Sequence, residues 1–413
     1  MTFSRYILYA LLIFTPLARG SVHGWAVGVI HLVTLIALTA FLLNKILRWE
    51  WEWIRTPLDI PIALLLILCF LSSFFSVHPR SSLWAMVLFV NYVVIFYLII
   101  HTLRTRSQLR QLIYLIIGVA TFLSIFGLFK RFGANPFPWW DYAGLKGDLP
   151  SVSSTFGNYN HLAGYLEMAI PLILGLFLAG FRGVRLILMI YLTSLMLAAI
   201  ILSLSRGGWI GCLLGLGFMA VALATNRYFE HRKLIAALAG GFLVVALVVL
   251  ASTPVVERIR TFEQRGETPN FRARVTVWGV TVEMIKDHPL LGTGPGTFAT
   301  VFTKYQPPGF ASRYFMAHND YLHFTSEVGL PLVAILAWMI IALYRRGFTK
   351  LKDPSRLVRG TTLGAMSGIT AILFHSTVDF NLHIPSNALL FTVLLAIVAA
   401  PLPKHDHGTS NRP

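Results

Sequence analysis

Three arginines are the first candidates for chemistry in this 413-residue chain. Arg206 lies in SLSRGGWIG, and Arg272 and Arg274 lie in FRARVTVW. A guanidinium is a planar fork of donors that suits bidentate binding of phosphate, and a pyrophosphate needs more than one such cation. Gly207 and Gly208 would allow a tight reversal of the chain and close approach of a ligand to the backbone. Arg206 and Arg274 therefore predict a pyrophosphate site; the alternatives are an interfacial arginine and a solvated helix face.

His318, in AHNDYLHFTSEVGLP, is the candidate general base. Imidazole is near neutral at pH 7 and can accept a proton from a hydroxyl group. Asn319 can orient a sugar hydroxyl, and Glu327 can hold the imidazole of His318 in one tautomer. The alternative is a capping or interfacial histidine, which applies more strongly to His323 than to His318.

Two further segments carry polar residues suited to substrate contact. HSTVDFNLHIPSN supplies His375, Asp379 and His383, which are better suited to support than to catalysis. FGNYNH supplies Asn158 and Asn160 as possible contacts to a sugar or a phosphate.

Several familiar chemistries lack their motifs in this chain. There is no D-x-D, D-x-E or H-E-x-x-H motif to hold a metal, and no G-x-S-x-G nucleophile elbow. GTGPGTF lacks the Lys-Ser/Thr of a phosphate loop, and His405-Asp406-His407 is interpreted as solvated tail. The 2 cysteines exclude a multi-cysteine metal site. We therefore expect a transfer reaction that uses no cofactor and no metal.

Composition indicates what must position these residues. The chain is 56% hydrophobic and 12% charged, whereas a soluble domain is about 25% charged. A helix needs roughly 20 mostly apolar residues to span a bilayer. Twelve stretches qualify: 6–19, 24–46, 58–77, 83–103, 111–129, 162–180, 186–205, 208–225, 234–252, 330–345, 360–379 and 388–402. The prediction is an all-α, polytopic protein with about 12 transmembrane helices in one membrane domain, residues 1–413, without an evident cleavable signal peptide.

The basic residues indicate the orientation in the membrane. With the N-terminus inside, the inner connections and the termini hold 20 of the 34 lysines and arginines. Both termini are therefore expected in the cytoplasm. Topology accounts for most of the formal charge of +17, so a nucleic-acid partner is not needed to explain it.

Two outer loops are longer than tight connections, at 130–161 and 253–329. Long connections commonly carry function. In the second loop, FRARVTVWGVTVEMIKDH predicts a helix that ends before Pro289, followed by a turn at GTGPG. One side of this helix would carry Val277, Trp278, Thr281, Met284 and Ile285.

The polar residues inside the spans share one depth. Arg206, Glu167, His375 and Asp379 all fall toward the outer leaflet, on the side of the two long loops. A carrier would place its polar site near the bilayer midplane. A cluster at one interface favours an enzyme that acts on a lipid headgroup.

The quoted motifs together resemble those of a known family. SLSRGGW, R-x-x-x-W followed by DHPLLGTGPGTF, and AHNDYLHFTSEVGLP are similar to segments of the O-antigen ligase and polymerase superfamily. FGNYNHLAGYLEM and HSTVDFNLHIPSN resemble segments of many members, and the resemblance covers about 150–390.

The resemblance implies a GT-C-like, metal-independent inverting glycosyltransferase at the periplasmic face of the bacterial inner membrane. Its donor would be a glycan on undecaprenyl pyrophosphate. The roles that carry over are pyrophosphate binding by Arg206 and Arg274, with Arg272 as the alternative to Arg274, and proton abstraction by His318.

The acceptor stays open among three branches of the superfamily. An O-antigen ligase uses lipid A–core in lipopolysaccharide biosynthesis, a polymerase uses another lipid-linked glycan, and a third branch glycosylates proteins. The ligase is slightly favoured. The alternative from a different class is a polyprenyl-glycan transporter, which would tolerate loss of His318.

Overall fold

The computed structural model describes residues 2–135, 151–178, 180, 183–225, 240, 269–308 and 314–402. These residues form helices and connections and contain no strand. Eight of the helices are long and apolar enough to cross a membrane, and three shorter helices are apolar as well. The predicted all-α, multi-pass membrane fold is confirmed.

The apolar helices follow the predicted spans closely. They are α1 (Thr2–Leu17), α2 (Gly24–Arg48), α3 (Asp59–Phe74), α4 (Pro79–Thr102), α5 (Arg106–Arg131), α6 (Tyr159–Leu178), α7 (Val184–Leu202), α8 (Arg206–Thr225), α14 (Pro331–Lys350), α15 (Arg356–His375) and α16 (Pro385–Ala399). These eleven correspond to eleven of the twelve predicted spans. The ninth predicted span, 234–252, and the tail with His405 and His407 lie outside the described residues.

Local sequence explains where several helices begin. Thr105 precedes α5, and its hydroxyl accepts a hydrogen bond from the backbone N–H of Gln108 while the Gln108 side chain accepts one from the backbone of Thr105. This capping box satisfies two backbone donors that the first helical turn would leave unpaired. Pro79, Pro331 and Pro385 occupy the first turns of α4, α14 and α16, where proline costs no hydrogen bond.

Helices α6 and α15 form the buried centre of the bundle. Their backbones touch because glycines face each other: a Cβ on Gly175 would strike the carbonyl oxygen of Gly360, and one on Gly368 would lie 2.6 Å from the carbonyl oxygen of Met168. Small residues allow this close approach in a membrane, where packing replaces the hydrophobic effect as the main attraction between helices.

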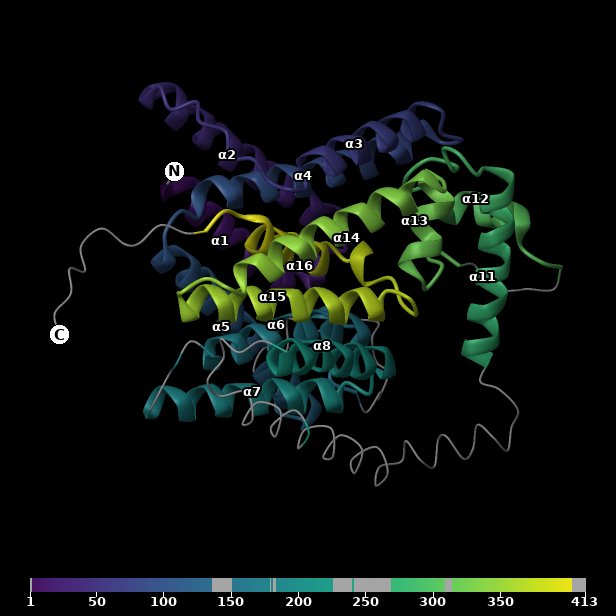
Figure 1. The fold of residues 1–413 in the computed structure, drawn as a ribbon. Coiled ribbons are helices and arrows are strands. Elements are labelled where there is room, and N and C mark those ends of the chain that lie inside the picture. Colours follow the sequence, from purple (N-terminus) through teal and green to yellow (C-terminus); the bar gives the residue numbers. More distant parts are fainter. Residues whose placement is uncertain are drawn as a thin grey trace.

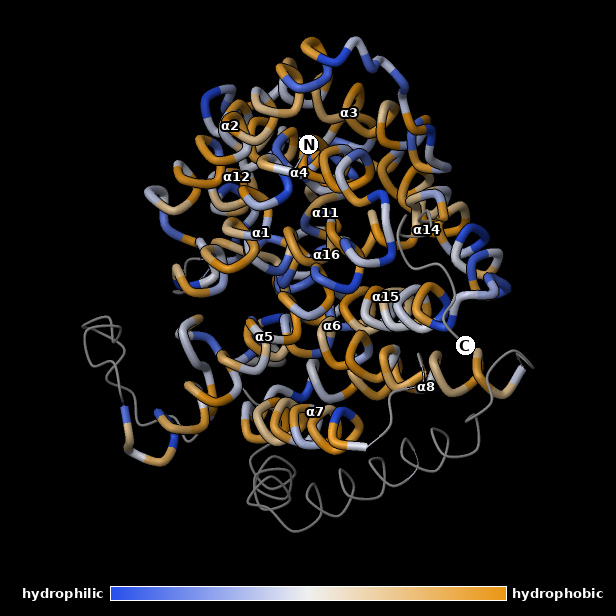
Figure 2. Tube along the Cα trace, turned by 90° about the vertical axis from the view of Figure 1, so that its left-hand side faces the viewer, coloured by the Kyte–Doolittle hydropathy of each residue, from blue (hydrophilic) through white to orange (hydrophobic). Residues whose placement is uncertain are grey.

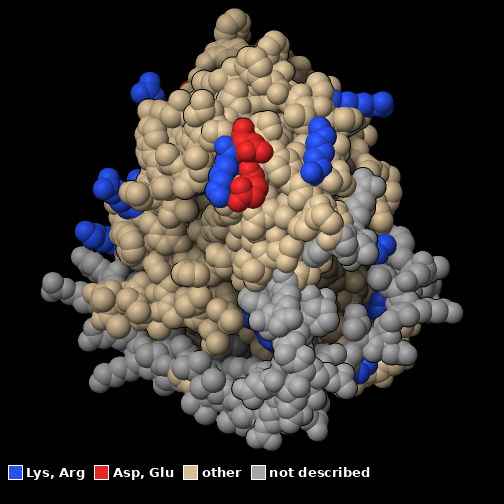
Figure 3. Space-filling model, turned by 90° about the vertical axis from the view of Figure 1, so that its right-hand side faces the viewer, with Lys and Arg blue, Asp and Glu red and all other residues tan. Residues whose placement is uncertain are grey.

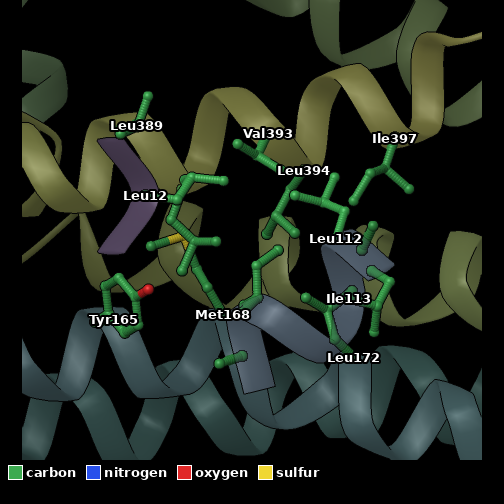
Figure 4. Close-up of a cluster of buried hydrophobic side chains, with 14 of the residues drawn as sticks. Leu12, Leu112, Ile113, Tyr165, Met168, Leu172, Leu389, Val393, Leu394 and Ile397 are labelled. Atoms are coloured by element: carbon green, nitrogen blue, oxygen red, sulfur yellow. The ribbon is translucent and has the colours of Figure 1, made fainter. Parts of the chain in front are cut away.

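Apolar side chains from α1, α5, α6 and α16 fill the space beside this pair. Figure 4 shows Leu12, Leu112, Met168 and Leu394 directed toward one another. Large hydrophobic residues are also exposed on the outside of the helices, for example Leu35, Phe70 and Ile187. Figure 2 shows that most residues along the helices are hydrophobic. A helix that is apolar on both sides is expected where one side packs against protein and the other faces lipid.

Three helices that do not span gather at one end of the bundle, on the right in Figure 1. They are α11 (Pro269–Asp287), α12 (Phe298–Tyr305) and α13 (Asp320–Val328). The predicted helix and its buried side are confirmed, since Val277, Thr281, Met284 and Ile285 are buried. The indole of Trp278 is part-buried and donates to the backbone oxygen of Ala317. The GTGPG turn is confirmed as well, with positive φ at all three of its glycines.

Candidate functional site

The segment that follows α15 is the meeting point of the candidate residues. It runs from His375 through a turn to the 3-10 helix η4 (Asn381–His383), after which α16 begins. We call residues 375–383 the junction segment. Contacts to it come from α6, α8, α11 and α13, so the chain brings distant candidates together at the α11–α13 end of the bundle.

His318 lies beside Asp379 of the junction segment. The Nδ1 atom of His318 is 3.5 Å from Oδ1 of Asp379, whose side chain is 3% exposed. This Nδ1 is buried, and its contact with Asp379 is too long to be a hydrogen bond, so Nδ1 has no hydrogen-bond partner among the described residues. The imidazole side chain is 27% exposed, so a substrate can reach it. Catalytic hydrogen bonds are often long before substrate binds.

The backbone of His318 adopts a conformation that few residues tolerate. Its φ is 51°, in the left-handed region, which costs free energy for a residue with a side chain. Both flanks are held in place: Ala317 accepts from Trp278, and the backbone N–H of Asp320 donates to the oxygen of Ser376 at 2.9 Å. A strained residue between fixed neighbours is typical of a functional position.

The charges around Asp379 keep it ionised. Burial by itself would raise the pKa of this carboxyl, but the nearby imidazole of His318, followed by His375, His161 and Arg274, lowers the pKa to about 2. The backbone N–H of Phe380 also donates to Oδ1 at 2.9 Å. An ionised carboxylate attracts the N–H of an imidazole, so it favours the His318 tautomer with the proton on Nδ1.

Arg274 reaches the same segment from α11. Its guanidinium donates to the backbone oxygen of Val378 at 2.8 Å, next to Asp379 in the chain. Arginine has five N–H donors, so this bond leaves others for a ligand. The backbone of Arg272 lies in the first turn of α11, and its side chain lies outside the described part of the structure.

Arg206 is the exposed first residue of α8. The next residue, Gly207, packs against the junction segment: a Cβ there would lie 2.6 Å from the His375 ring and 3.1 Å from the Val378 side chain. Arg206 is therefore anchored one residue from the segment that also holds Arg274 and His318.

The expected role of the two glycines after Arg206 is wrong in one respect. The reversal between α7 and α8 is made by residues 203–205, and Gly207 and Gly208 lie in the first turn of α8. They are small because a neighbour fills the space: at Gly208 an added Cβ would meet the side chain of Ala163 at 2.5 Å. Close helix packing thus explains them without a ligand.

His375 is buried and pairs with Glu167 of α6. Its Nδ1 lies 3.0 Å from Oε1 of Glu167, and both side chains are fully enclosed. The pair joins the end of α15 to the middle of the core, directly beneath the first turn of α8. It supports the junction segment and does not face the outside.

The structure corrects the expected partner of His318. Glu327 contacts His323, with Oε1 3.3 Å from Nε2, and accepts from the backbone N–H of Phe298 at 2.9 Å. The carboxylate beside His318 is that of Asp379. The Oδ1 atom of Asn319 caps α13 by accepting from the backbone N–H of Leu322. The residue that caps this helix is therefore Asn319, next to His318 in the chain.

Asn158 and Asn160 form a turn before and at the start of α6. The Oδ1 atom of Asn158 accepts from the backbone N–H of Asn160 at 2.9 Å, and both side chains are part-buried. This is an Asx turn, in which an asparagine side chain accepts from the backbone two residues later. The turn explains the asparagine at position 158 without a substrate contact. The hydrogen bond of Asn158 is local to this turn and does not reach His318 or Arg274.

Sequence inspection missed Asp320, which is 1% exposed. Its Oδ2 accepts from the Ser376 hydroxyl and the Leu382 N–H, and its Oδ1 lies 2.6 Å from Nδ1 of His383. One carboxylate thus ties the start of α13, just after His318, to both ends of the junction segment. The signal in the sequence was an acidic residue two positions after His318, at the start of a short helix.

His161 of α6 was also missed. It is buried, and the centroid of its ring lies 5.1 Å from that of Phe380, with the rings edge-on. The centroid of the Phe380 ring lies 4.9 Å from that of His318. Phe380 is therefore held between two imidazoles, which limits the positions that the His318 ring can take.

Comparison with known proteins gives one family match. Residues 191–337 match the family model described as O-Antigen ligase, and no curated protein matches the chain. The matched range contains Arg206, Arg274 and His318, whereas His375 and Asp379 lie beyond it. Residues 191–337 therefore resemble the O-antigen ligase family, and the described helices around them are those of a multi-pass membrane protein.

Proposed function

We propose that this chain, whose residues 191–337 resemble the O-antigen ligase family, transfers a glycan from undecaprenyl pyrophosphate to lipid A–core. The observation that carries the proposal is the convergence on one segment of a general base, a carboxylate behind it, and two arginines. His318 lies beside Asp379, Arg274 donates to the backbone of the neighbouring Val378, and Arg206 adjoins the same segment through Gly207.

His318 acts as the base. With its Nδ1 proton directed at Asp379, the Nε2 lone pair is left to take the proton of the acceptor hydroxyl. The hydroxyl oxygen forms a bond to the anomeric carbon as the bond from that carbon to the pyrophosphate oxygen breaks on the opposite face. The product has inverted configuration, and the proton rests on His318.

The arginines stabilise the leaving group. Negative charge grows on the pyrophosphate as the glycosidic bond breaks, and fixed guanidinium donors stabilise it more strongly in the transition state than in the ground state. Figure 3 views the α11–α13 end, where basic side chains lie at several places among the described atoms and acidic ones form a patch near the centre. No step requires a metal, so the reaction should proceed during brief exposure to a chelator.

The lipid substrates place the reaction at the membrane surface. We assign the α11–α13 end to the periplasmic side of the inner membrane, with both termini in the cytoplasm, because in the predicted topology the connections on the other side together with the termini hold 20 of the 34 lysines and arginines. The alternative function within the superfamily is a polymerase that extends a lipid-linked glycan. Protein glycosylation and a polyprenyl-glycan transporter are the remaining alternatives.

The test uses purified protein in detergent with EDTA and a glycan on undecaprenyl pyrophosphate, and it reads the glycan products on a gel. One tube contains lipid A–core and the other does not; a second pair of tubes omits EDTA. Product only with lipid A–core supports the ligase, and longer lipid-linked glycan without it identifies a polymerase. Absence of product in all four tubes would contradict both and favour a protein acceptor or the transporter.

A further inference from the structure

A group of metal-ligand side chains joins α13 to the last residue of the junction segment, beside the proposed active site. His323 and Glu327 are four residues apart on one face of α13, and His383 belongs to η4. One potential ligand atom from each residue lies within 4.8 Å of the other two. His323 and Glu327 are 3% and 4% exposed, so this is not a surface cluster of the common kind.

His383 is oriented in the way that metal-binding histidines are. Its Nδ1 lies 2.6 Å from Oδ1 of Asp320, and a carboxylate can only accept there, so Nδ1 carries the proton. The Nε2 lone pair is then free, and Nε2 is buried without a hydrogen-bond partner among the described residues. A carboxylate that fixes the tautomer of a ligating histidine is the usual outer partner in zinc sites.

The His323–Glu327 pair has the spacing of two ligands on one ion. The backbone N–H of Ala317 donates to Nδ1 of His323 at 3.3 Å, so the proton of the neutral ring is on Nε2, which lies 3.3 Å from Oε1 of Glu327. Two ligands bound at about 2.0 Å in a tetrahedron lie roughly 3.3 Å apart. For a metal ion to bind Nε2, the proton of His323 moves to Nδ1, and the N–H of Ala317 gives up its 3.3 Å contact there.

The charges also suit a divalent ion. The carboxylate of Glu327 would bind the ion directly, and that of Asp320 contacts the ligand His383. Two carboxylates thus balance the two positive charges of a buried ion. Two imidazoles and one carboxylate are ligands that zinc accepts, with a fourth position for water.

We propose that His323, Glu327 and His383 form a structural zinc site that clamps α13 to η4. The site joins the helix that begins just after His318 to the segment that begins just after Asp379, and so it fixes the separation of that pair. The ion takes no part in glycan transfer, and the site can exist whether or not the proposed function is correct.

The first test measures the metal content of the purified protein by mass spectrometry, after removal of any histidine tag. The chain used carries His405→Ala and His407→Ala, so that the tail cannot supply zinc. We expect about one zinc per chain. We also expect a melting temperature that falls after prolonged dialysis against a chelator and recovers with Zn²⁺ but not with Mg²⁺. Zinc below about a tenth per chain, with no change in melting temperature on adding Zn²⁺, would overturn the proposal.

Two variants identify the ligands. His383→Phe keeps the stacking of ring 383 on Phe324, which lies at 4.3 Å, but removes a ligand; Glu327→Gln keeps an acceptor for the N–H of Phe298. Both should lose the zinc, and the control His288→Ala, at the end of α11, should keep it. If both variants retain zinc, the ion is bound at another place in the protein, and the assignment of these ligands is wrong. If neither variant folds, the zinc content and the zinc-dependent melting temperature of the parent chain decide the question.

Discussion

The Nδ1 atom of His318 lies 3.5 Å from Oδ1 of Asp379, although the two residues lie on opposite sides of α14 and α15 in the chain. His318 precedes α13, in the connection that follows α12, and Asp379 follows α15. Three elements converge to make this pair: Trp278 holds the residue before His318, Asp320 holds the junction segment, and the Glu167–His375 pair anchors its start. The pair is thus built by the fold and not by local sequence.

Replacing His318 by alanine should remove the base. We expect the rate of glycan transfer to fall by about 10²- to 10⁴-fold, because general-base catalysis supplies a factor of this size. Binding of the pyrophosphate donor should change little, since the arginines remain. Transfer is measured by the gel assay and donor binding by equilibrium titration. His288→Ala is the matched control, and unchanged transfer by His318→Ala would remove His318 from the mechanism.

Asp379→Asn should lower transfer while leaving the shape of the site intact. An amide does not favour the His318 tautomer with the proton on Nδ1, so fewer molecules offer a free Nε2; about 10²-fold or more is expected. The matched control is Asp287→Asn, a carboxylate at the end of α11 that accepts from Tyr305. Equal activity in the two variants would contradict the role given to Asp379.

The low pKa of Asp379 also predicts how stability depends on pH. The folded value of about 2 lies below the ordinary value of 3.8, so the ionised carboxylate stabilises the folded protein. This stabilisation, roughly 2 kcal/mol, is fully present above about pH 4 and is lost as pH falls toward 2. Thermal unfolding between pH 3 and 6 should show a smaller pH slope for Asp379→Asn than for the parent chain. Identical slopes would show that Asp379 is not held ionised by folding.

Hydropathy predicted the spans because a membrane imposes a length and a composition on any helix that crosses it. Eleven predicted spans correspond to described helices. The same reasoning cannot say which helices touch. The contact between Gly175 and Gly360 depends on two helices meeting at one point, and neither glycine carries that information in its own surroundings.

For the site, residue type and membrane side were enough to select His318, Arg206 and Arg274. They were not enough to pair His318 with the correct carboxylate. Glu327 is near His318 in sequence, but α13 turns it toward His323, four residues before it on the same helix face. Asp379 is distant in sequence, and only the fold of the junction segment brings it close.

Two glycines of α8 should respond differently to substitution by alanine. A Cβ at Gly215 would lie 2.6 Å from the carbonyl oxygen of Ser367 in α15, whereas nothing lies within 4 Å at Gly217. We expect Gly215→Ala to lower the free energy of unfolding by about 1–3 kcal/mol, because the helices cannot separate without losing contacts. Gly217→Ala should be neutral or slightly stabilising, since alanine is the better helix former. Chemical denaturation in detergent compares the two, and equal effects would show that α8 and α15 are not packed so closely.

Arg206 should be sensitive to the shape of its cation as well as to its charge. Arg206→Lys keeps a positive charge but replaces the planar fork by a single ammonium group, which cannot bind phosphate in a bidentate manner. We expect Arg206→Ala to lower transfer by about 10²- to 10³-fold, the usual cost of removing one group that stabilises a developing charge. Arg206→Lys should recover only part of that loss.

The control for Arg206 is Arg80→Ala, which removes another exposed arginine at the start of a spanning helix, α4. If Arg206 binds the pyrophosphate, both of its variants should weaken donor binding as well as transfer, and the deficit should deepen at higher salt because screening weakens the remaining contacts. If Arg206 is only an interfacial arginine, Arg206→Ala and Arg80→Ala should bind the donor equally well. Full activity of Arg206→Lys would show that charge alone is required and that the guanidinium fork makes no bidentate contact.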